Sequence, residues 1–337
     1  MARVGIKDIA KKAGVSIATV SHAFRNPGRV SEDTRRRVLA AAKEVGYTPN
    51  KMAASLRTAR SGNIVAIIPD VGDSFNSEII KGIDAVASDR GYAVLLGNTQ
   101  GSEEREREFA AMPLSRQADG IILMSQRLPF DVPEDGSEPD NLPPLVSGCE
   151  STGYDWVLNV AIDDRQGAID ATNHLIELGH RRIAVITGDH ESASTRKRLA
   201  GFREAMADAG LEIRDAWVIY GRYNADSGEI AAQELQLQKE RPTAIFCFSD
   251  EIALGCMYSL RLAGFAIPAD VSIVGFDDIP FARYFTPSLT TVAQPTEAIG
   301  RTCATLLLDL IEGERPKTNR FVLPHKLIVR DSTARLS

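Results

Sequence analysis

The chain has 337 residues, of which 44% are hydrophobic and 25% are charged, and its net charge is −6. This length predicts two or three folding units, and the composition is that of a soluble globular protein. No run approaches the roughly 18 apolar residues of a membrane-spanning helix, and the first residues contain no apolar run of signal-peptide length. We therefore expect a cytoplasmic protein with no membrane partner.

The charge is unevenly distributed along the chain. Residues 1–60 contain 13 Lys/Arg against 4 Asp/Glu, a net charge of +9, whereas the remaining residues carry a net charge of −15. A basic segment on an acidic body is typical of a module that binds a polyanion. A solvated basic tail is the alternative, but the regular apolar spacing and the helix caps of this segment argue against it.

Residues 6–46 show apolar spacing and capping residues typical of short helices. A serine precedes the second and the third helix as an N-cap, and Gly14, after the first, suits the positive φ of a helix C-terminus. The predicted helices span residues 6–13, 17–24 and about 32–46. A helix, a short turn around Gly14 and a second short helix make a helix-turn-helix.

Residues 47–60 (YTPNKMAASLRTAR) follow the three helices. A helix can start after Pro49, but about eight residues are too few for a stable isolated helix in water. We expect a segment that folds conditionally.

From residue 62 onward, strand-like and helical runs alternate, which predicts parallel sheets covered by helices. A repeat of this length predicts two doubly wound lobes, with a ligand at the carboxyl ends of their strands. The strand-like runs are 64–68, 93–96, 120–124, 182–186, 217–220, 244–248 and 271–274, and helical runs include 78–90, 165–178, 198–209 and 251–262.

Two further features of the body bear on its chemistry. Residues 128–145 contain five prolines and five acidic residues but no lysine or arginine, which predicts a surface loop within the first lobe. The four cysteines and five histidines show neither a C-x-x-C pair nor a metal-ligand spacing. We expect buried thiols, no metal and no cofactor.

Residues 6–24 (IKDIAKKAGVSIATVSHAF) closely resemble the helix-turn-helix of the lactose/galactose-repressor family, the LacI family. Residues 47–50 and 53–56 are similar to that family's hinge helix. The likeness covers nearly the whole chain, through residues 177–183 (ELGHRRI), 198–202 (RLAGF), 249–255 (SDEIALG), 274–278 (VGFDD) and 289–292 (LTTV).

The resemblance implies a small all-α helix-turn-helix DNA-binding domain joined to an α/β periplasmic-binding-protein-like body of two doubly wound parallel-sheet lobes. The DNA-binding domain would span residues 1–48, the hinge helix 49–60 and the effector-binding and dimerisation domain 61–337. The first lobe would comprise about 61–161 and 292–321, and the second about 162–291 and 322–337.

A member of this family would be a transcriptional repressor that binds near-palindromic double-stranded operator DNA and is controlled by a small ligand. Residues after 333 contain no heptad pattern, which favours a homodimer over a tetramer. The sequence alone leaves open whether the ligand induces or co-represses.

On the second helix, an exposed face carries the residues that would read DNA. His22 can hydrogen-bond base edges, and Ile17 and Ala18 can meet thymine methyl groups. Ser16, Thr19 and Ser21 are better suited to phosphates, which orient the domain without reading sequence. A solvated surface histidine is the alternative for His22.

In the hinge, the resemblance implies that Leu56 wedges into the minor groove and kinks the operator. It also turns Asn50 and Ala53 toward the minor groove. The alternative for Leu56 is packing against the body.

In the body, matching the family's blocks places the effector pocket at Phe75, Asn76, Arg196, Tyr223, Ser249 and Asp277. Aromatic rings can stack on a flat ligand, an arginine offers a fork of donors, and Asp277 can accept from hydroxyl groups. Phe75 could instead be a core residue. These groups suit a polyhydroxylated or heterocyclic ligand.

Residues 127–131 (RLPFD) and 141–144 (NLPP) resemble the cytidine-repressor branch, whose effector is a nucleoside. This resemblance favours induction over co-repression by the ligand. A sugar is the alternative effector. An enzyme is not expected, because the chain has no phosphate-binding G-x-x-x-x-G-K-[ST] or G-x-G-x-x-G motif and no G-x-S-x-G nucleophile elbow. A periplasmic solute-binding protein shares the two-lobed body but would not carry a basic helix-turn-helix.

Overall fold

The structure is a computed structural model that describes residues 5–25, 27–47 and 60–336. It divides into two compact units, Met1–Ser61 and Gly62–Ser337. Within the described residues, no helix is both long enough and apolar enough to cross a lipid bilayer.

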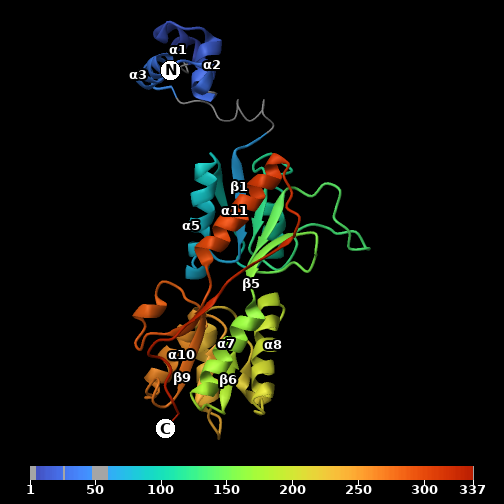
Figure 1. The fold of residues 1–337 in the computed structure, drawn as a ribbon, viewed down its shortest axis with the longest axis vertical. Helices are drawn as coiled ribbons and strands as arrows, with labels where there is room; N and C mark the ends of the chain where they lie inside the picture. Colours follow the sequence, from blue (N-terminus) through green and yellow to red (C-terminus); the bar gives the residue numbers. More distant parts are fainter. Residues whose placement is uncertain (1–4, 26, 48–59, 337) are drawn as a thin grey trace. The chain divides into compact units, whose positions relative to one another are not determined.

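The first unit is a three-helix domain, drawn in blue in Figure 1, with α1 (Ile6–Ala13), α2 (Ile17–Arg25) and α3 (Glu32–Glu44). Gly14 ends α1 with φ +65°, as predicted for a helix C-terminus. The Ser16 and Ser31 hydroxyls accept from backbone N–H groups in the first turns of α2 and α3. The helices enclose a core of Ile9, Ala10, Ala13, Val20, Ala23, Val38, Ala41 and Ala42.

Strands and helices alternate along most of the described part of the second unit. Its elements are, in chain order, β1 (Asn63–Ile68), α5 (Ser74–Asp89), β2 (Ala93–Asn98), α6 (Glu103–Ala110), β3 (Ile121–Leu123), β4 (Leu145–Gly148), β5 (Leu158–Ile162), α7 (Asp164–Glu177), β6 (Ile183–Ile186), α8 (Ala193–Asp208), β7 (Val218–Ile219), α9 (Ala225–Gln236), β8 (Ala244–Cys247), α10 (Asp250–Leu262), β9 (Ser272–Asp277), β10 (Thr290–Ala293), α11 (Thr296–Glu312), β11 (Arg320–Leu323) and β12 (Lys326–Ile328).

The strands of this unit form two sheets. The first has the order β11-β5-β4-β3-β1-β2, with every neighbouring pair parallel. The second has the order β12-β10-β9-β8-β6-β7 and is parallel except where β12 pairs with β10. Because the strand order reverses within each sheet, each lobe is doubly wound, as the sequence predicts.

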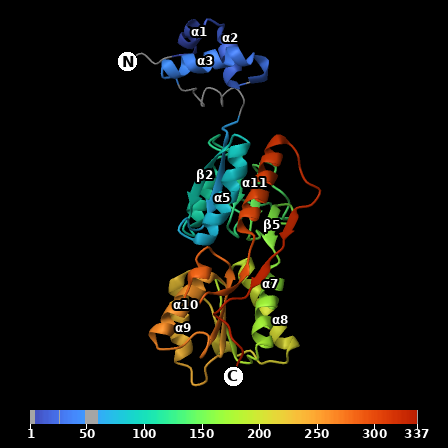
Figure 2. The same ribbon diagram turned by 60° about the vertical axis from the view of Figure 1, so that its left-hand side comes forward.

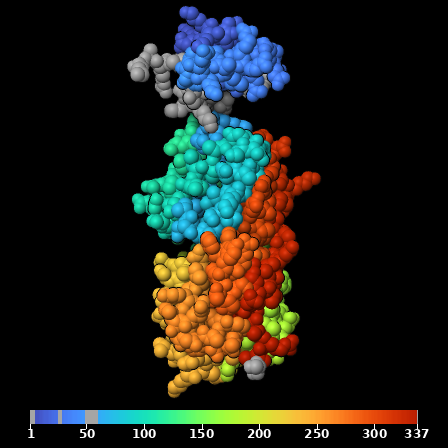
Figure 3. Space-filling view, turned by 90° about the vertical axis from the view of Figure 1, so that its left-hand side faces the viewer, coloured from blue at the N-terminus to red at the C-terminus, as the bar shows by residue number. Residues whose placement is uncertain are grey.

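Helices cover both faces of the second sheet, with α9 and α10 on one side and α7 and α8 on the other (Figure 2). In the first lobe, α5 and α11 lie side by side (Figure 3). They approach closely through glycine, since a Cβ atom on Gly82 would lie 2.2 Å from the Glu297 carbonyl oxygen. The buried strand residues are mostly Ile, Val and Leu, as expected for strands covered on both faces.

The described chain passes between the two sheets after β5, after β10 and after β11. β10 ends at Ala293 and β11 at Leu323, so both strands run past the boundaries that we expected at 291 and 321. The difference arises because a crossing occurs where a strand ends, and strand ends are poorly marked in the sequence.

The loop expected at residues 128–145 is present in the first lobe between β3 and β4, and only its last residue, Leu145, belongs to β4 (Figure 1). Arg315 pairs with Glu138 at 3.2 Å, Arg107 pairs with Asp131 at 3.0 Å, and the Trp156 indole donates to the Gly136 carbonyl. These contacts hold the acidic loop against its own lobe.

Candidate functional sites

The exposed face of α2 combines apolar and hydrogen-bonding side chains. Ile17 is 46% exposed although it is large and apolar, and Ala18 beside it is exposed as well. Ser21 and His22 are half-buried, one turn further along the helix. Val20 faces inward, where it is fully buried in the domain core.

Two of the predicted phosphate contacts are already hydrogen-bonded to each other. The Ser16 hydroxyl lies 2.8 Å from the Thr19 hydroxyl and also accepts from the Thr19 backbone N–H. The described surface of this domain also carries exposed cations: Lys7, Lys11, Lys12, Arg29, Arg35, Arg36, Arg37 and Lys43. Asn50, Ala53 and Leu56 lie outside the described residues, so the hinge assignments stay predictions.

The second candidate site lies at the carboxyl ends of the parallel strands, where each lobe turns toward the other. Asp73 caps α5 after β1, Asp164 opens α7 after β5, and Asp277 ends β9. This edge of a doubly wound sheet is where such folds bind ligands. Asp73 of the first lobe acts electrostatically on Asp277 of the second, so both lobes contribute to the same region.

Arg198 of α8 is the centre of this region and is only 5% exposed. Its Nε donates to Asp164 Oδ1 at 2.9 Å, one terminal nitrogen donates to the Phe248 carbonyl, and the same nitrogen lies 3.8 Å from Asp277 Oδ1. The guanidinium lies over the Phe276 ring at 3.7 Å from its centroid. We call Asp164, Arg198, Tyr223, Phe276 and Asp277 the interlobe cluster.

Burial dominates the electrostatics of the cluster. It raises the pKa of Asp277 well above its usual range, although Arg198 and a 2.8 Å hydrogen bond from Gln294 act in the opposite direction. Burial likewise raises the pKa of Tyr223 to about 12, so its hydroxyl stays protonated near neutral pH. The cluster therefore combines one fixed cation, two carboxyl groups and a phenol, with the buried Phe276 ring packed against the cation.

The predicted effector residues differ in their burial and in their hydrogen-bond partners. Asn76 is buried in the first turn of α5, where its amide donates to the Asp70 carbonyl, and Phe75 packs partly against the main core. The Tyr223 hydroxyl lies 2.7 Å from the Thr195 hydroxyl. The Ser249 hydroxyl is used as the N-cap of α10, accepting from the Ile252 N–H.

Arg196 is misplaced in the sequence-based prediction. It is exposed, and its guanidinium donates to the Glu191 carbonyl on the outside of α8. Two residues turn a helix by about 200°, so Arg196 and Arg198 point in opposite directions. Arg198 shares its face with buried Leu199, Phe202 and Met206, and that apolar pattern was the signal that could have found it.

Further polar residues join the lobes and carry no obvious sequence signal. Glu150, after β4, accepts from the Ser192 hydroxyl at 2.7 Å and from the Ser194 N–H at 3.3 Å. The Ser74 backbone at the start of α5 lowers the pKa of the Glu251 carboxyl group of α10, which burial raises, so the two groups interact. In both pairs, a glutamate of one lobe interacts with the N-terminal end of a helix in the other, where the helix dipole favours an anion.

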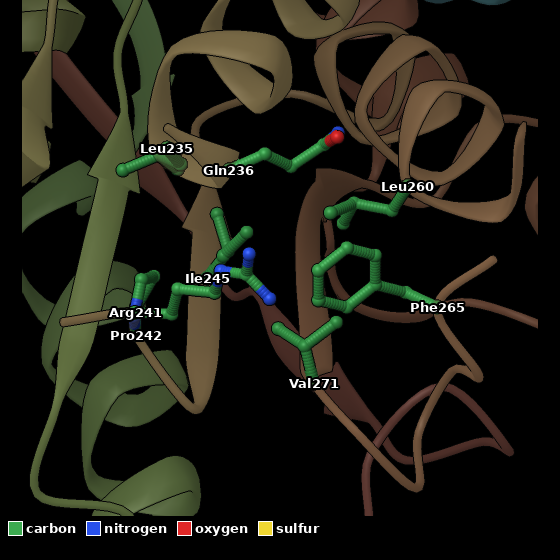
Figure 4. Close-up of a pocket in the computed structure, with 8 residues that line it drawn as sticks. All are labelled: Leu235, Gln236, Arg241, Pro242, Ile245, Leu260, Phe265 and Val271. Carbon is green, nitrogen blue, oxygen red and sulfur yellow. The ribbon is translucent and has the colours of Figure 1, made fainter. Parts of the chain in front are cut away.

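A separate hollow inside the second lobe is too small for an effector. It is lined by Leu235, Gln236, Arg241, Pro242, Ile245, Leu260, Phe265 and Val271 (Figure 4). Its volume of about 20 Å³ is enough for about one water molecule.

Comparison with known proteins gives the family. The model of bacterial regulatory proteins of the lacI family matches residues 5–50, and the model of the periplasmic binding protein-like domain matches residues 172–333. The chain is 40% identical over 331 residues to the HTH-type transcriptional repressor CytR of Escherichia coli K12, covering 98% of this chain and 96% of that protein. The chain belongs to the LacI family.

Other LacI-family relatives agree along their whole length. The HTH-type transcriptional repressor PurR of Vibrio campbellii is 34% identical over 334 residues, covering 98% of this chain and 99% of that protein. A lac repressor dimer bound to operator and the anti-inducer ONPF superposes with a TM-score of 0.84 at 27% identity, over 99% of this chain and all of that one. These matches confirm the predicted fold class and the resemblance to the cytidine-repressor branch.

Proposed function

We propose that this LacI-family protein is a transcriptional repressor that binds near-palindromic operator DNA as a homodimer and releases it when a nucleoside such as cytidine binds the interlobe cluster. The observation that carries this proposal is the full-length 40% identity to the repressor CytR. It accounts for both units of the chain at once. The same argument makes the protein a non-enzymatic regulator that acts in the cytoplasm, where operator DNA lies.

On the DNA side, α2 of each protomer would enter the major groove. His22 would contact a base edge, and Ile17 and Ala18 would meet thymine methyl groups. The exposed cations of the first unit would supply the sequence-independent part of the affinity. Asn50, Ala53 and Leu56 would read the minor groove at the operator centre.

On the ligand side, the interlobe cluster matches the parts of a nucleoside. Asp277 and Asp164 can accept from ribose hydroxyl groups, and Arg198 can donate to a base carbonyl. Tyr223 and Phe75 can stack on the flat base. In this proposal Arg198 has the role that the family resemblance predicts for Arg196.

The coupling between sites would run through the contacts that join the lobes. The Glu150–Ser192 and Glu251–Ser74 contacts both depend on how the two lobes are arranged. A ligand held by Asp164, Arg198 and Asp277 would change the relative free energies of the lobe arrangements, and with them these contacts. Coupling of this kind typically amounts to about 1–3 kcal/mol. Reorientation of the first lobes would then separate the hinge segments and release DNA.

The test combines a ligand screen with a DNA-binding titration. An operator is first selected from random duplexes, and its affinity for the full chain is measured by fluorescence anisotropy at several salt concentrations. We expect log K to fall steeply with log salt, and we expect cytidine to lower operator affinity about tenfold or more. No selected operator, or a salt-independent affinity, would refute the repressor assignment.

A sugar is the second candidate for the effector. A transcriptional regulator CelR–cellobiose complex is 33% identical to this chain, with a TM-score of 0.70 over 98% of this chain, and buried carboxylates suit sugar hydroxyls as well as ribose. A thermal-shift screen with nucleosides, free bases, pentoses and cellobiose separates the two. A shift with pentoses or cellobiose and none with nucleosides would favour the sugar.

A further inference from the structure

Asp250 is a fully buried carboxyl group that is hydrogen-bonded to Ile279 and Thr291, which are not members of the interlobe cluster. It is the first residue of α10, and one of its oxygens would lie 2.2 Å from a Cβ atom on Gly275. The carboxyl group therefore rests directly on the backbone of β9, in space that only a glycine leaves free. A charge in this position has to be hydrogen-bonded to be tolerated.

Both oxygens of Asp250 are hydrogen-bonded to the segment around the end of β9. Oδ2 accepts from the Ile279 backbone N–H at 2.9 Å, and Oδ1 accepts from the Thr291 hydroxyl at 2.6 Å. The first bond fixes the turn that follows Asp277, and the second ties that turn to neighbouring β10. Asp250 thus links α10, β9 and β10 at one point.

The turn that Asp250 holds is strained. Asp277 has φ +116° and Asp278 has φ +55°, conformations that residues other than glycine adopt at an energetic cost. Surrounding contacts must therefore maintain them. Asp250 does so from inside the lobe, while Arg330 holds Asp278 from the other side with an ion pair of 2.6 Å.

We propose that Asp250 is a positioning residue for the effector: by holding the Asp277–Ile279 turn in its strained form, it directs the Asp277 carboxyl group toward Arg198 and sets the ligand affinity of the interlobe cluster. This inference rests on the proposed function only in taking Asp277 as an effector contact. Asp250 itself is not one of the effector contacts, but its ionisation sets the ligand affinity of the interlobe cluster.

The electrostatic surroundings of Asp250 make this control depend on pH near neutrality. Its pKa is raised to about 7, chiefly by burial and to a lesser extent by Asp278, against the lowering effect of the bonds from Thr291 and Ile279 and of the charge of Arg330. Asp277 also faces it, and Cys247 lies close enough to interact electrostatically. Because the ionised carboxylate is the better acceptor for both bonds, protonation loosens the turn as pH falls through about 7.

The test compares the full-length protein with two variants and a matched control. Asp250→Asn keeps the shape but removes the charge, and Thr291→Val removes the hydroxyl donor while keeping Asp250. Asp226→Asn changes an exposed carboxylate in the first turn of α9. Cytidine affinity is measured by calorimetry between pH 6 and pH 8, and amide exchange of residues 277–284 is measured without ligand.

For a carboxylate with a pKa of about 7 that must be ionised, wild-type Kd should rise about tenfold from pH 8 to pH 6. Asp250→Asn should weaken binding about tenfold at pH 8 and flatten this dependence, with faster exchange of residues 277–284. Thr291→Val should move the midpoint to higher pH, because its bond lowers the pKa of Asp250. The Asp226→Asn control should match the wild type.

Unchanged exchange of residues 277–284 in Asp250→Asn would overturn the positioning role. So would a wild-type Kd and pH profile in a folded Asp250→Asn protein. If the wild type binds no nucleoside at any pH, the nucleoside proposal fails instead, and the exchange measurement still decides whether Asp250 holds the turn.

Discussion

Arg198 is a buried cation whose partners fix the direction of every donor. The Nε bond to Asp164 and the terminal bond to the Phe248 carbonyl require the planar fork of a guanidinium. The ammonium of a lysine is a point charge and cannot make both bonds from one position. A lysine at position 198 would therefore keep the positive charge but lose one of these two hydrogen bonds.

The first prediction concerns Arg198→Lys, with Arg196→Ala as its control on the same helix. Arg198→Lys should weaken nucleoside binding by about tenfold or more, and leave operator affinity without ligand unchanged. Arg196→Ala should change neither, because Arg196 is exposed. Calorimetry with cytidine and anisotropy with operator give both numbers, and loss of ligand response in Arg196→Ala alone would restore the sequence-based assignment.

His180 provides the second residue-scale prediction. Its ring nitrogens lie 3.0 Å from the Thr243 hydroxyl, 3.1 Å from the Ser272 hydroxyl and 3.1 Å from the Ala334 carbonyl, and burial lowers its pKa below 6.5. The unfolded chain binds this proton more readily than the folded one. Its contribution to stability is therefore present above about pH 6.5 and is lost as pH falls through the lower folded pKa.

The measurement is urea unfolding of wild type and His180→Gln between pH 5 and pH 8. Asp250 and Asp73, whose pKa values are raised to about 7 and about 6, act with the opposite sign and are common to both proteins. We expect the difference in unfolding free energy between the two proteins to shrink toward acid pH, by at most about 1.4 kcal/mol per pH unit. A difference independent of pH would contradict a titrating His180.

Elements with a local signal were predictable from the sequence. α1 follows from its apolar stripe and the glycine after it, and α3 from its serine cap. α8 begins at Ala193, five residues before the predicted start, because its first turn is small, polar and buried against the other lobe. β11 and β12 are short strands that pair with distant β5 and β10, and no local pattern encodes that pairing.

Residues of the interlobe region differ in how far the sequence predicts them. Asp277 and Tyr223 could be assigned from blocks resembling a family, but Asp164, Glu150 and Asp250 could not. Their roles depend on which strand ends become neighbours, and that is a property of sheet order, not of spacing along the chain.

The third prediction belongs to the helix α2. His22→Ala should reduce affinity for the selected operator by about 1–3 kcal/mol, since a base contact of this kind carries discrimination. Affinity for a scrambled duplex should stay nearly constant, because it rests on phosphate contacts made by lysine and arginine. Both titrations are run at one salt concentration, and equal losses on both duplexes would indicate that His22 supports the fold of the domain instead.

On the scale of the whole molecule, the two units carry net charges of opposite sign. The basic first unit attracts DNA, and the acidic body repels it, so non-specific contact with the body is disfavoured. A near-palindromic operator requires two copies of the first unit, since each half-site takes one recognition helix. The body must therefore supply a surface that joins two protomers.

The outer face of α10 fits that requirement. Leu254, Tyr258 and Leu262 are exposed at four-residue intervals, so they form one apolar stripe along the helix. Exposed Tyr284 and Phe281 are two further large apolar side chains of the second lobe. An exposed apolar stripe of this kind marks a protein interface, and a lac repressor dimer of the same fold superposes on the chain with a TM-score of 0.84.

The last prediction is that Tyr258→Glu turns the dimer into a monomer at micromolar concentration. A charge placed in the middle of an apolar interface loses its hydration without gaining a partner, which should raise the dimer Kd by at least about tenfold. Operator affinity should fall with it, because a monomer engages one half-site, while cytidine binding within each protomer should persist. Leu114→Glu, an exposed apolar position in the first lobe, is the matched control and should remain dimeric. Light scattering after size-exclusion chromatography gives the mass directly. A Tyr258→Glu protein that stays dimeric and binds operator like the wild type would show that the protomers meet through another surface.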